Sequence, residues 1–366
     1  MRQCDGIMSY EANAGEIIDM SNPFVTTVVG SMPKPAWLME QLPLNAEGKQ
    51  VHGKGADWMF SGDLLETARD DATRLTLHDQ ISAGIDVVCD GEQRRSSYIT
   101  YVTSRLEGFD YETLTKKWTR NKRRLAEVGR CIGPIQRSGS MLRRDAEFML
   151  AETDRPVKIT MPGPMTVVDS TADEHYGKES DMAMEVAAAL NEEARELDAL
   201  GIAVIQFDEP VFSRYPGKVT DWGVTALDRC VEGIKSAKTA AHVCYSYPMP
   251  GVPRPINDSY SVILEALEHS KIDQLALEFE ASKLDPQLLR LCPSKTIMYG
   301  CIDNGVDEIE TPEHVAGKLL EAAKHMPAEQ IQAAPDCGLL PLPLDIARAK
   351  LRTMADGARL ARERLG

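Results

Sequence analysis

The chain has 366 residues, of which 43% are hydrophobic and 27% are charged. This balance is typical of a globular protein and excludes collagen-like, coiled-coil and disordered classes. The length suits two or three domains or one large α/β barrel with additions. The net charge of −15 would repel a phosphate backbone, which argues against nucleic-acid binding.

The apolar runs and the first residues favour a cytoplasmic protein. The longest apolar runs, such as residues 202–207, have the length of a strand rather than of a bilayer-spanning helix, so no membrane association is expected. The first residues mix acidic and polar groups where a secretory signal needs a basic start and an apolar segment. In the cytoplasm the 8 cysteines are expected to be thiols or metal ligands rather than a disulfide framework.

Eight short apolar runs, each followed by polar, Gly or Pro residues, predict β-strands. They are residues 24–30, 85–90, 157–161, 202–207, 240–244, 274–278, 296–300 and 331–334. Amphipathic segments separate most of them. The clearest of these segments places Met182, Val186, Leu190, Ala194 and Leu197 on one helical face. Apolar strands that alternate with helices predict an α/β fold with a parallel sheet, and eight such units predict a (β/α)8 TIM barrel.

Two regions fall outside this repeat. Residues 1–22 are expected to form an N-terminal arm, and residues 104–155 an excursion between the second and third strands of a barrel that spans residues 23–366. The excursion has a cationic segment around Trp118. This segment could be a solvated basic hairpin, or it could reach over the barrel mouth, bind an anionic substrate or pack on a partner subunit.

Reactive side chains gather at the predicted carboxyl ends of the strands, where barrel enzymes carry their active sites. His242 and Cys244 are two residues apart on the fifth strand, so both can reach one ion. Glu278 ends the sixth strand and Cys337 follows the eighth. Together they offer one nitrogen, one oxygen and two sulfur donors, which favours Zn2+. A His-x-Cys pair alone is more often two core residues, and Cys301 competes with Cys337 as a ligand.

A zinc site with thiolate ligands indicates chemistry on a thiol, because zinc lowers the pKa of a bound thiol until it is a nucleophilic thiolate. Two carboxylates, Glu92 and Asp208, also follow predicted strands. They are candidates to bind the ammonium group of a substrate, and equally candidates to cap helices.

Seven segments, in chain order, resemble the catalytic domain of the cobalamin-independent methionine synthases. They are VVGSMPKPAWL, GIDVVCDGEQRR, MPGPMT, IQFDEP, HVCY, ALEF and PDCG. The resemblance covers residues 22–366 and is strongest to the short members that consist of the catalytic barrel alone. It implies a zinc site made by His242, Cys244, Glu278 and Cys337.

The same resemblance implies a pocket for homocysteine. Ser31 would bind its carboxylate, and Glu92 and Asp208 its amino group. The thiol of homocysteine would then displace a methyl group from a donor to give methionine. A methylfolate is the donor in the long members of the family, and a corrinoid or another methylated compound remains open here, as do a donor protein and a homo-oligomer.

Three departures from the family pattern bear on the donor. Ser170 stands where the long enzymes have a tryptophan that stacks on the pterin. Arg214 replaces an acidic residue after the DEP motif, and Glu310 stands where a histidine is expected. These changes predict that methylfolate is a poor donor.

Two other functions compete with methyl transfer to homocysteine. Related zinc enzymes join an epoxide to the thiol sulfonate coenzyme M, and Arg94, Arg95 and Arg214 would suit a sulfonate. The second alternative is a barrel that holds zinc without catalysing a reaction. The paired Glu92 and Asp208 argue against it, since a structural zinc site does not require carboxylates for an amino acid.

Overall fold

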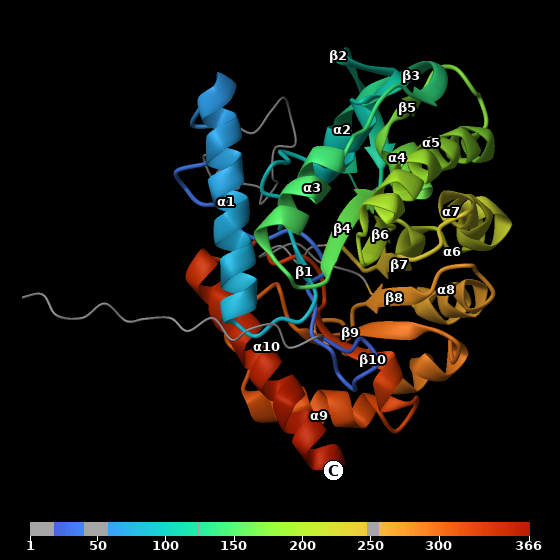
Figure 1. Cartoon of the computed structure of the whole chain (residues 1–366). Coiled ribbons are helices and arrows are strands. Elements are labelled where there is room, and N and C mark those ends of the chain that lie inside the picture. The colour runs from blue at the N-terminus through green and yellow to red at the C-terminus, as the bar shows by residue number, and fades with distance from the viewer. Residues whose placement is uncertain (1–17, 40–57, 123, 247–255) are drawn as a thin grey trace, which may run out of the picture.

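Seven parallel strands form the central sheet in the computed structural model, which describes residues 18–39, 58–122, 124–246 and 256–366. They are β1 Val88–Cys89, β4 Val157–Pro162, β6 Val204–Asp208, β7 Lys238–Val243, β8 Gln274–Leu277, β9 Thr296–Ile302 and β10 Ile331–Pro335. They lie side by side in this order. The sheet curls as in a TIM barrel (Figure 1). The predicted α/β alternation with a parallel sheet is therefore confirmed for seven of the eight strands.

The first predicted strand, residues 24–30, is not a strand of this sheet. The segment makes only isolated parallel bridges, between Thr26 and Ala333 of β10 and between Thr27 and Val87 just before β1. The backbone N and the Oγ1 of Thr26 both donate to Asp86, at 2.8 and 3.0 Å. The backbone also hydrogen-bonds both neighbours, since Phe24 N donates to the O of Ile331 at 2.9 Å and Val87 N donates to the O of Thr26 at 3.0 Å. The segment therefore lies between β10 and β1 without a continuous ladder.

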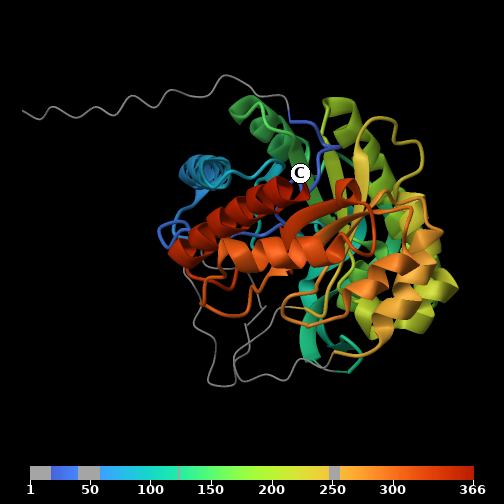
Figure 2. The same ribbon diagram turned by 90° about the horizontal axis from the view of Figure 1, so that it is seen from below.

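Helices cover the outer side of the sheet. They are α1 Gly62–Ser82, α2 Tyr98–Thr103, α3 Arg143–Glu152, α4 Pro164–Ser170, α5 Glu179–Leu200, α6 Pro216–Lys218, α7 Val224–Cys230, α8 Ser259–Glu268, α9 Pro312–Ala322 and α10 Leu344–Leu365. In Figure 1, α5, α7 and α8 lie along β6 to β8, and Figure 2 shows α9 beside α10. None of the helices in the described ranges is long and apolar enough to span a bilayer.

The amphipathic helix predicted around residues 182–197 is α5. All five residues of its predicted apolar face are fully buried, so the 3.6-residue pattern did identify the face that packs on the sheet. The helix ends at Gly201, whose φ of 93° forms a left-handed cap that a residue with a Cβ would adopt only with strain.

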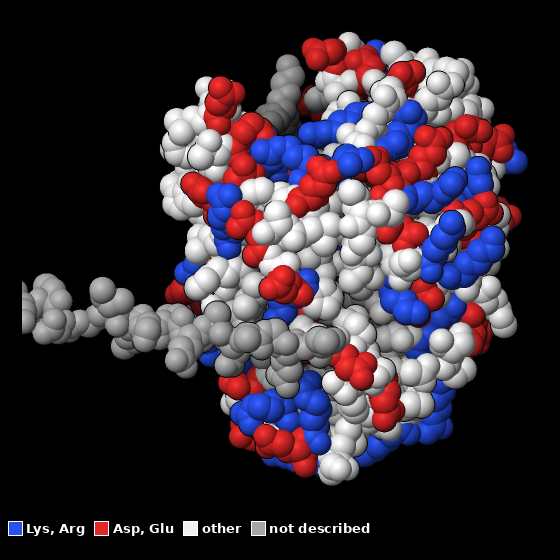
Figure 3. Space-filling view, viewed as in Figure 1, with Lys and Arg blue, Asp and Glu red and all other residues white. Residues whose placement is uncertain are grey.

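The predicted excursion contains a long hairpin and a helix. Strands β2 Leu106–Thr119 and β3 Arg124–Arg137 pair antiparallel, β5 Ala172–Asp173 joins β3 in parallel, and α3 follows before β4. Most of the predicted arm, residues 1–17, lies outside the described residues. On the face drawn in Figure 3, acidic and basic side chains alternate over the helices.

The inner side of the curled sheet is filled by one layer of apolar side chains. Its members are Val25, Val87, Val204, Ala240, Ala276, Met298 and Ala334. Five of them come from β6, β7, β8, β9 and β10, one each. Val25 comes from residues 24–30 and Val87 directly precedes β1, while β4 contributes none. At β4 the buried Lys158 lies against this layer, with its Nζ 3.7 Å from the Sδ of Met298.

Candidate metal and substrate site

Three of the four predicted zinc ligands converge at the carboxyl ends of β7 and β10. His242 and Cys244 project to the same side of β7 because they are two residues apart. The curl of the sheet then brings Cys337, which follows β10, to within 3.8 Å of Cys244, measured between the Sγ atoms. The ligand atoms of His242, Cys244 and Cys337 all lie within 4.8 Å of one another, and all three residues are buried.

The imidazole of His242 is held through its Nδ1, which lies 3.0 Å from Oδ1 of Asp208 at the end of β6. Its Nε2 is buried and has no hydrogen-bond partner among the described residues. A histidine that ligates zinc typically hydrogen-bonds a carboxylate with the other ring nitrogen. When the imidazole is neutral, its proton on Nδ1 faces Asp208, and Nε2 is the atom that can bind a metal ion.

The three side chains are electrostatically coupled. Burial would lower the pKa of His242, but the Cys244 thiolate and Asp208 raise it to about 10. A hydrogen bond from Cys337, together with the charge on His242, lowers the pKa of Cys244 well below its usual value despite burial. The same hydrogen bond and burial raise the pKa of Cys337. The residues thus support a thiolate, as metal coordination requires.

The spacing of these residues fits zinc. Two sulfur atoms that each lie about 2.3 Å from a tetrahedral zinc ion are about 3.8 Å apart, which matches the separation of Cys244 and Cys337. Glu278 follows β8, is fully buried, and accepts a hydrogen bond from the backbone N of Tyr245 at 3.1 Å through Oε2. It lies outside the three-residue cluster, but its charge contributes to the raised pKa of Cys337.

The predicted homocysteine pocket places two carboxylates near each other. Burial raises the pKa of Glu92, and the charges of Asp208 and Asp90 raise it further against the effect of Arg95. Glu92 has a φ of 56°, a left-handed conformation that costs about 1–3 kcal/mol in a residue other than glycine. It accepts a hydrogen bond from Thr160 Oγ1 at 2.9 Å. Two buried carboxylates of this kind are suited to bind a cation.

Ser31, the predicted carboxylate contact, is also buried. Its backbone O accepts a hydrogen bond from the N of Leu339 at 2.8 Å, two residues beyond Cys337. The segment that carries Ser31 is thus attached to the loop that carries a predicted metal ligand.

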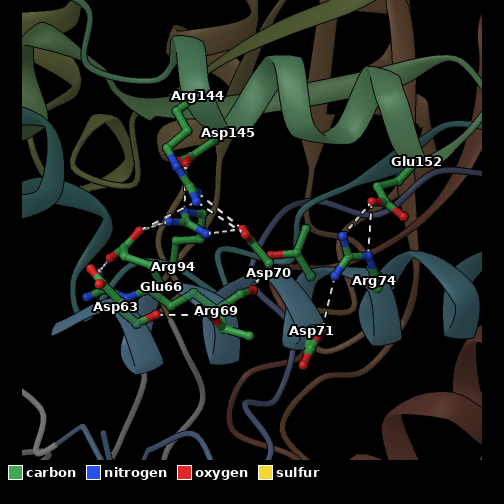
Figure 4. A network of polar contacts seen from close by, with 12 residues as sticks. Asp63, Glu66, Arg69, Asp70, Asp71, Arg74, Arg94, Arg144, Asp145 and Glu152 are labelled. Carbon is green, nitrogen blue, oxygen red and sulfur yellow. Dashed lines mark hydrogen bonds and ion pairs between the residues drawn. The ribbon is translucent and has the colours of Figure 1, made fainter. Parts of the chain in front are cut away.

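The guanidinium group of Arg94 is occupied by a network between α1 and α3 (Figure 4). It forms ion pairs with Asp70 at 2.5 Å, with Asp145 at 3.1 Å and with Glu66. Arg95 pairs with Asp90 at 3.1 Å and donates to the backbone O of Thr160 at 2.7 Å. Both arginines are therefore engaged with protein groups.

The remaining predicted donor-site residues are spread over three elements. Arg214 is buried and donates to the backbone O of Tyr245. Glu310 accepts hydrogen bonds from the N of Asp303 at 2.8 Å and from Lys350 of α10 at 2.8 Å. Ser170 is half-buried at the last position of α4. The residues next to Ser170 and Arg214 in the chain are in contact, since Tyr215 Oη donates to Oδ1 of Asp169 at 2.9 Å, whereas Glu310 is bound to α10.

The tip of the β2–β3 hairpin reaches α4, which the sequence left open. The backbone N of Arg120 donates to both carboxylate oxygens of Asp169, at 3.0 and 3.2 Å. Its guanidinium hydrogen-bonds the half-buried Tyr98, and burial together with the charges of Asp208 and Cys244 raises the pKa of that phenol. Tyr98 and Arg120 are thus neighbours of the site that we did not select from the sequence. The basic residues around Trp118 were a signal for Arg120, and no pattern in the sequence singled out Tyr98.

Cys301, the predicted competitor of Cys337, lies outside the cluster. It is buried, and its Sγ lies 3.5 Å from the backbone O of Ala334. Burial raises the pKa of this thiol far above its usual value, which makes it a poor thiolate ligand.

Comparison with known proteins gives a consistent result over most of the chain. The family described as the catalytic domain of cobalamin-independent synthase matches residues 24–360. The methionine synthase of Sulfurisphaera tokodaii is 33% identical over 343 residues, which cover 93% of each chain. That of Sulfolobus acidocaldarius is 31% identical over 341 residues, again with 93% of each chain covered.

A solved structure supports the same assignment. The B12-independent methionine synthase from Shewanella sp. W3-18-1, determined in complex with selenomethionine, is 37% identical and has a TM-score of 0.86. The match covers 94% of this chain and 99% of that one. The chain therefore belongs to the cobalamin-independent methionine synthase family and is a methionine synthase-like methyltransferase of the catalytic-domain type.

Proposed function

We propose that the protein is a zinc-dependent S-methyltransferase that methylates homocysteine to methionine, with residues 23–366 as its catalytic barrel. The observation that carries the proposal is the cluster of His242, Cys244 and Cys337, whose sulfur atoms have the separation expected for two ligands of one zinc ion. The family supports the reaction. The selenomethionine bound to the Shewanella protein is a selenium analogue of the product.

His242, Cys244 and Cys337 would hold the metal, with Glu278 as the fourth ligand. When bound, zinc would lower the pKa of the homocysteine thiol, so that a thiolate is present at neutral pH. Glu92 and Asp208 would hold the substrate ammonium through charge-assisted hydrogen bonds. This orients the sulfur toward the methyl donor. A sulfur–carbon bond then forms as the methyl carbon leaves the donor, which keeps the bonding electron pair.

The alternative reaction, alkylation of a thiol sulfonate, has less support. It was suggested by three arginines, but Arg94 and Arg95 are paired with carboxylates and Arg214 donates to a backbone carbonyl. The non-catalytic alternative gives no role to Glu92 and Asp208, although burial and the charge of Asp208 raise the pKa of Glu92 even with Arg95 Nη1 3.9 Å from its Oε1. Neither alternative explains as much of the site as methyl transfer to homocysteine.

The test is a parallel incubation of zinc-loaded protein and homocysteine with methylfolate, methylcobalamin or cell extract, followed by measurement of methionine. We expect methionine in at least one reaction and none with metal-free protein. If homocysteine fails to bind the zinc-loaded protein in calorimetry and no reaction gives methionine, the proposal is wrong.

A further inference from the structure

A chain of four buried polar side chains runs from the inner side of the sheet to the metal cluster. Its members are Lys158 on β4, Gln206 and Asp208 on β6, and His242 on β7, and Lys158 and Gln206 are fully buried. Asp208 and His242 already have roles in the proposed reaction. Lys158 and Gln206 do not, although an apolar side chain would fill their positions at lower cost.

The hydrogen bonds of this chain fix the orientation of each group. Lys158 Nζ donates to Oε1 of Gln206 at 3.0 Å and to the backbone O of Val28. Gln206 Nε2 donates to Oδ1 of Asp208 at 2.8 Å and to the backbone O of Val29 at 2.7 Å. An ammonium group can only donate and a carboxylate can only accept. The amide of Gln206 therefore cannot flip without breaking bonds at both ends.

This orientation determines what Asp208 can do. Its Oδ1 is shared by Gln206 Nε2 at 2.8 Å and His242 Nδ1 at 3.0 Å. Because both donors bind the same oxygen, Gln206 keeps Oδ1 next to Nδ1 of His242, which holds the imidazole ring at one angle. Partners of this kind matter for metal ligands, because their removal typically costs 10- to 100-fold in metal affinity or activity.

The hydrogen bonds of Lys158 offset the cost of burying its charge and connect two segments of the chain. A buried ammonium carries a desolvation cost of several kcal/mol unless its hydrogen bonds are satisfied. Lys158 lies against the apolar layer at Met298, 3.7 Å away, where a methionine or leucine would pack. Its hydrogen bonds to Val28 and Gln206 connect the segment of residues 24–30 to β6.

We propose that Lys158 and Gln206 are positioning residues that hold Asp208 against His242. The imidazole Nε2 is thereby directed to the metal, and Oδ2 of Asp208 is left for the ammonium of the substrate. The inference rests on the proposed function, because it assumes that His242 ligates a metal. It adds two residues to the site that take no direct part in binding or bond formation.

The variants Gln206→Met, Gln206→Glu and Lys158→Met test the proposal. Gln206→Met removes both side-chain hydrogen bonds with little change in volume. Gln206→Glu keeps an acceptor for Lys158 but places a second carboxylate against Asp208. Lys295→Met is the matched control, because Lys295 is also buried and donates to two backbone carbonyls, at 2.8 Å each, far from the cluster in sequence and on the opposite ends of strands.

The readouts are zinc affinity, the visible spectrum of the Co2+-loaded protein and the 15N signals of the His242 imidazole. We expect Gln206→Met and Gln206→Glu to weaken zinc binding about tenfold, to shift the cobalt bands and to broaden the Nδ1–H signal. Lys158→Met should shift the same signals by a smaller amount. Lys295→Met should lower stability and leave all three readouts unchanged.

Unchanged cobalt spectra and imidazole signals in folded Gln206→Glu and Lys158→Met would overturn the proposal, and these two variants decide it even if Gln206→Met does not fold. The result is distinguishable from a failure of the proposed function. If the wild-type protein binds zinc but forms no methionine, the proposed reaction is wrong. The spectra of the variants would still show whether Lys158 and Gln206 position His242.

Discussion

Two buried groups of ionisable side chains differ in how their charges are balanced. Between α1 and α3, the cation of Arg94 is surrounded by the carboxylates of Asp70 and Asp145, so the network is complete within the protein (Figure 4). At the ends of β7 and β10, a histidine and two cysteines direct donor atoms at one another instead. There the Cys244 thiolate and the charged His242 balance only each other, and the atoms that carry these charges are the ones that a metal ion would bind. What separates the structural network from the candidate ligand site is therefore that the donor atoms of the site converge on one point.

The largest effect is expected from removing a sulfur donor. Cys337→Ala should abolish stoichiometric zinc binding, because it leaves two of the three converging ligands. Cys301→Ala is the matched control and should keep about one zinc per chain, since Cys301 lies outside the cluster. Elemental analysis after dialysis measures both. If Cys337→Ala kept zinc and Cys301→Ala lost it, Cys301 rather than Cys337 would be the ligand.

The structural network should respond in the opposite way. Arg94→Met leaves the buried carboxylate of Asp145 without its cation, and breaking a buried pair costs about 3–5 kcal/mol of unfolding free energy. Urea unfolding measures this loss. The zinc content of the folded variant should equal that of the wild type, and a variant that lost zinc while retaining its stability would contradict the distinction between the two groups.

The sequence predicted the metal cluster better than the residues that support it. His242 and Cys244 were recognised by their two-residue spacing, and Cys337 by its place after a strand. Lys158 and Gln206 were missed, because a lone polar residue in an apolar strand reads as an interruption of the pattern. The spacing of Gln206 and Asp208 was a usable signal, since residues two apart share a face.

The parts of the fold that sequence patterns could not give depend on long-range contacts. Apolar runs located seven strands, but residues 24–30 make isolated bridges to two neighbours without forming a continuous ladder. The contact of Arg120 with Asp169 depends on the register of a hairpin whose two strands have 14 residues each. Neither contact can be predicted from residues that are close together in the sequence.

A smaller effect is expected from the carboxylate that faces Asp208. Glu92→Gln should weaken homocysteine binding about 10- to 100-fold, because a hydrogen bond to a charged group contributes about 1.5–3 kcal/mol. Zinc content should remain near one. Calorimetry on the zinc-loaded protein measures the affinity. Glu209→Gln is a suitable control, since Glu209 accepts hydrogen bonds from the backbone N of Met165 and of Thr166 at the start of α4.

In that control, stability should fall while homocysteine affinity is kept. If Glu92→Gln left the affinity for homocysteine unchanged, Glu92 would not bind the substrate and its role would be structural.

The smallest effect concerns the methyl donor, where the chain has Ser170 in place of the aromatic residue of the long enzymes. We expect methylfolate to support only slow turnover. Ser170→Trp should raise its apparent affinity about three- to tenfold, because an aromatic stack contributes about 0.5–1.5 kcal/mol beyond burial. Ser170 ends α4 beside Asp169, which anchors the hairpin tip, so a new ring there would border the site. Initial rates at several methylfolate concentrations measure the change, and zinc content should stay constant. Efficient turnover of methylfolate by the wild type, unaffected by Ser170→Trp, would show that this donor binds without the stack and that the substitution at Ser170 does not determine donor choice.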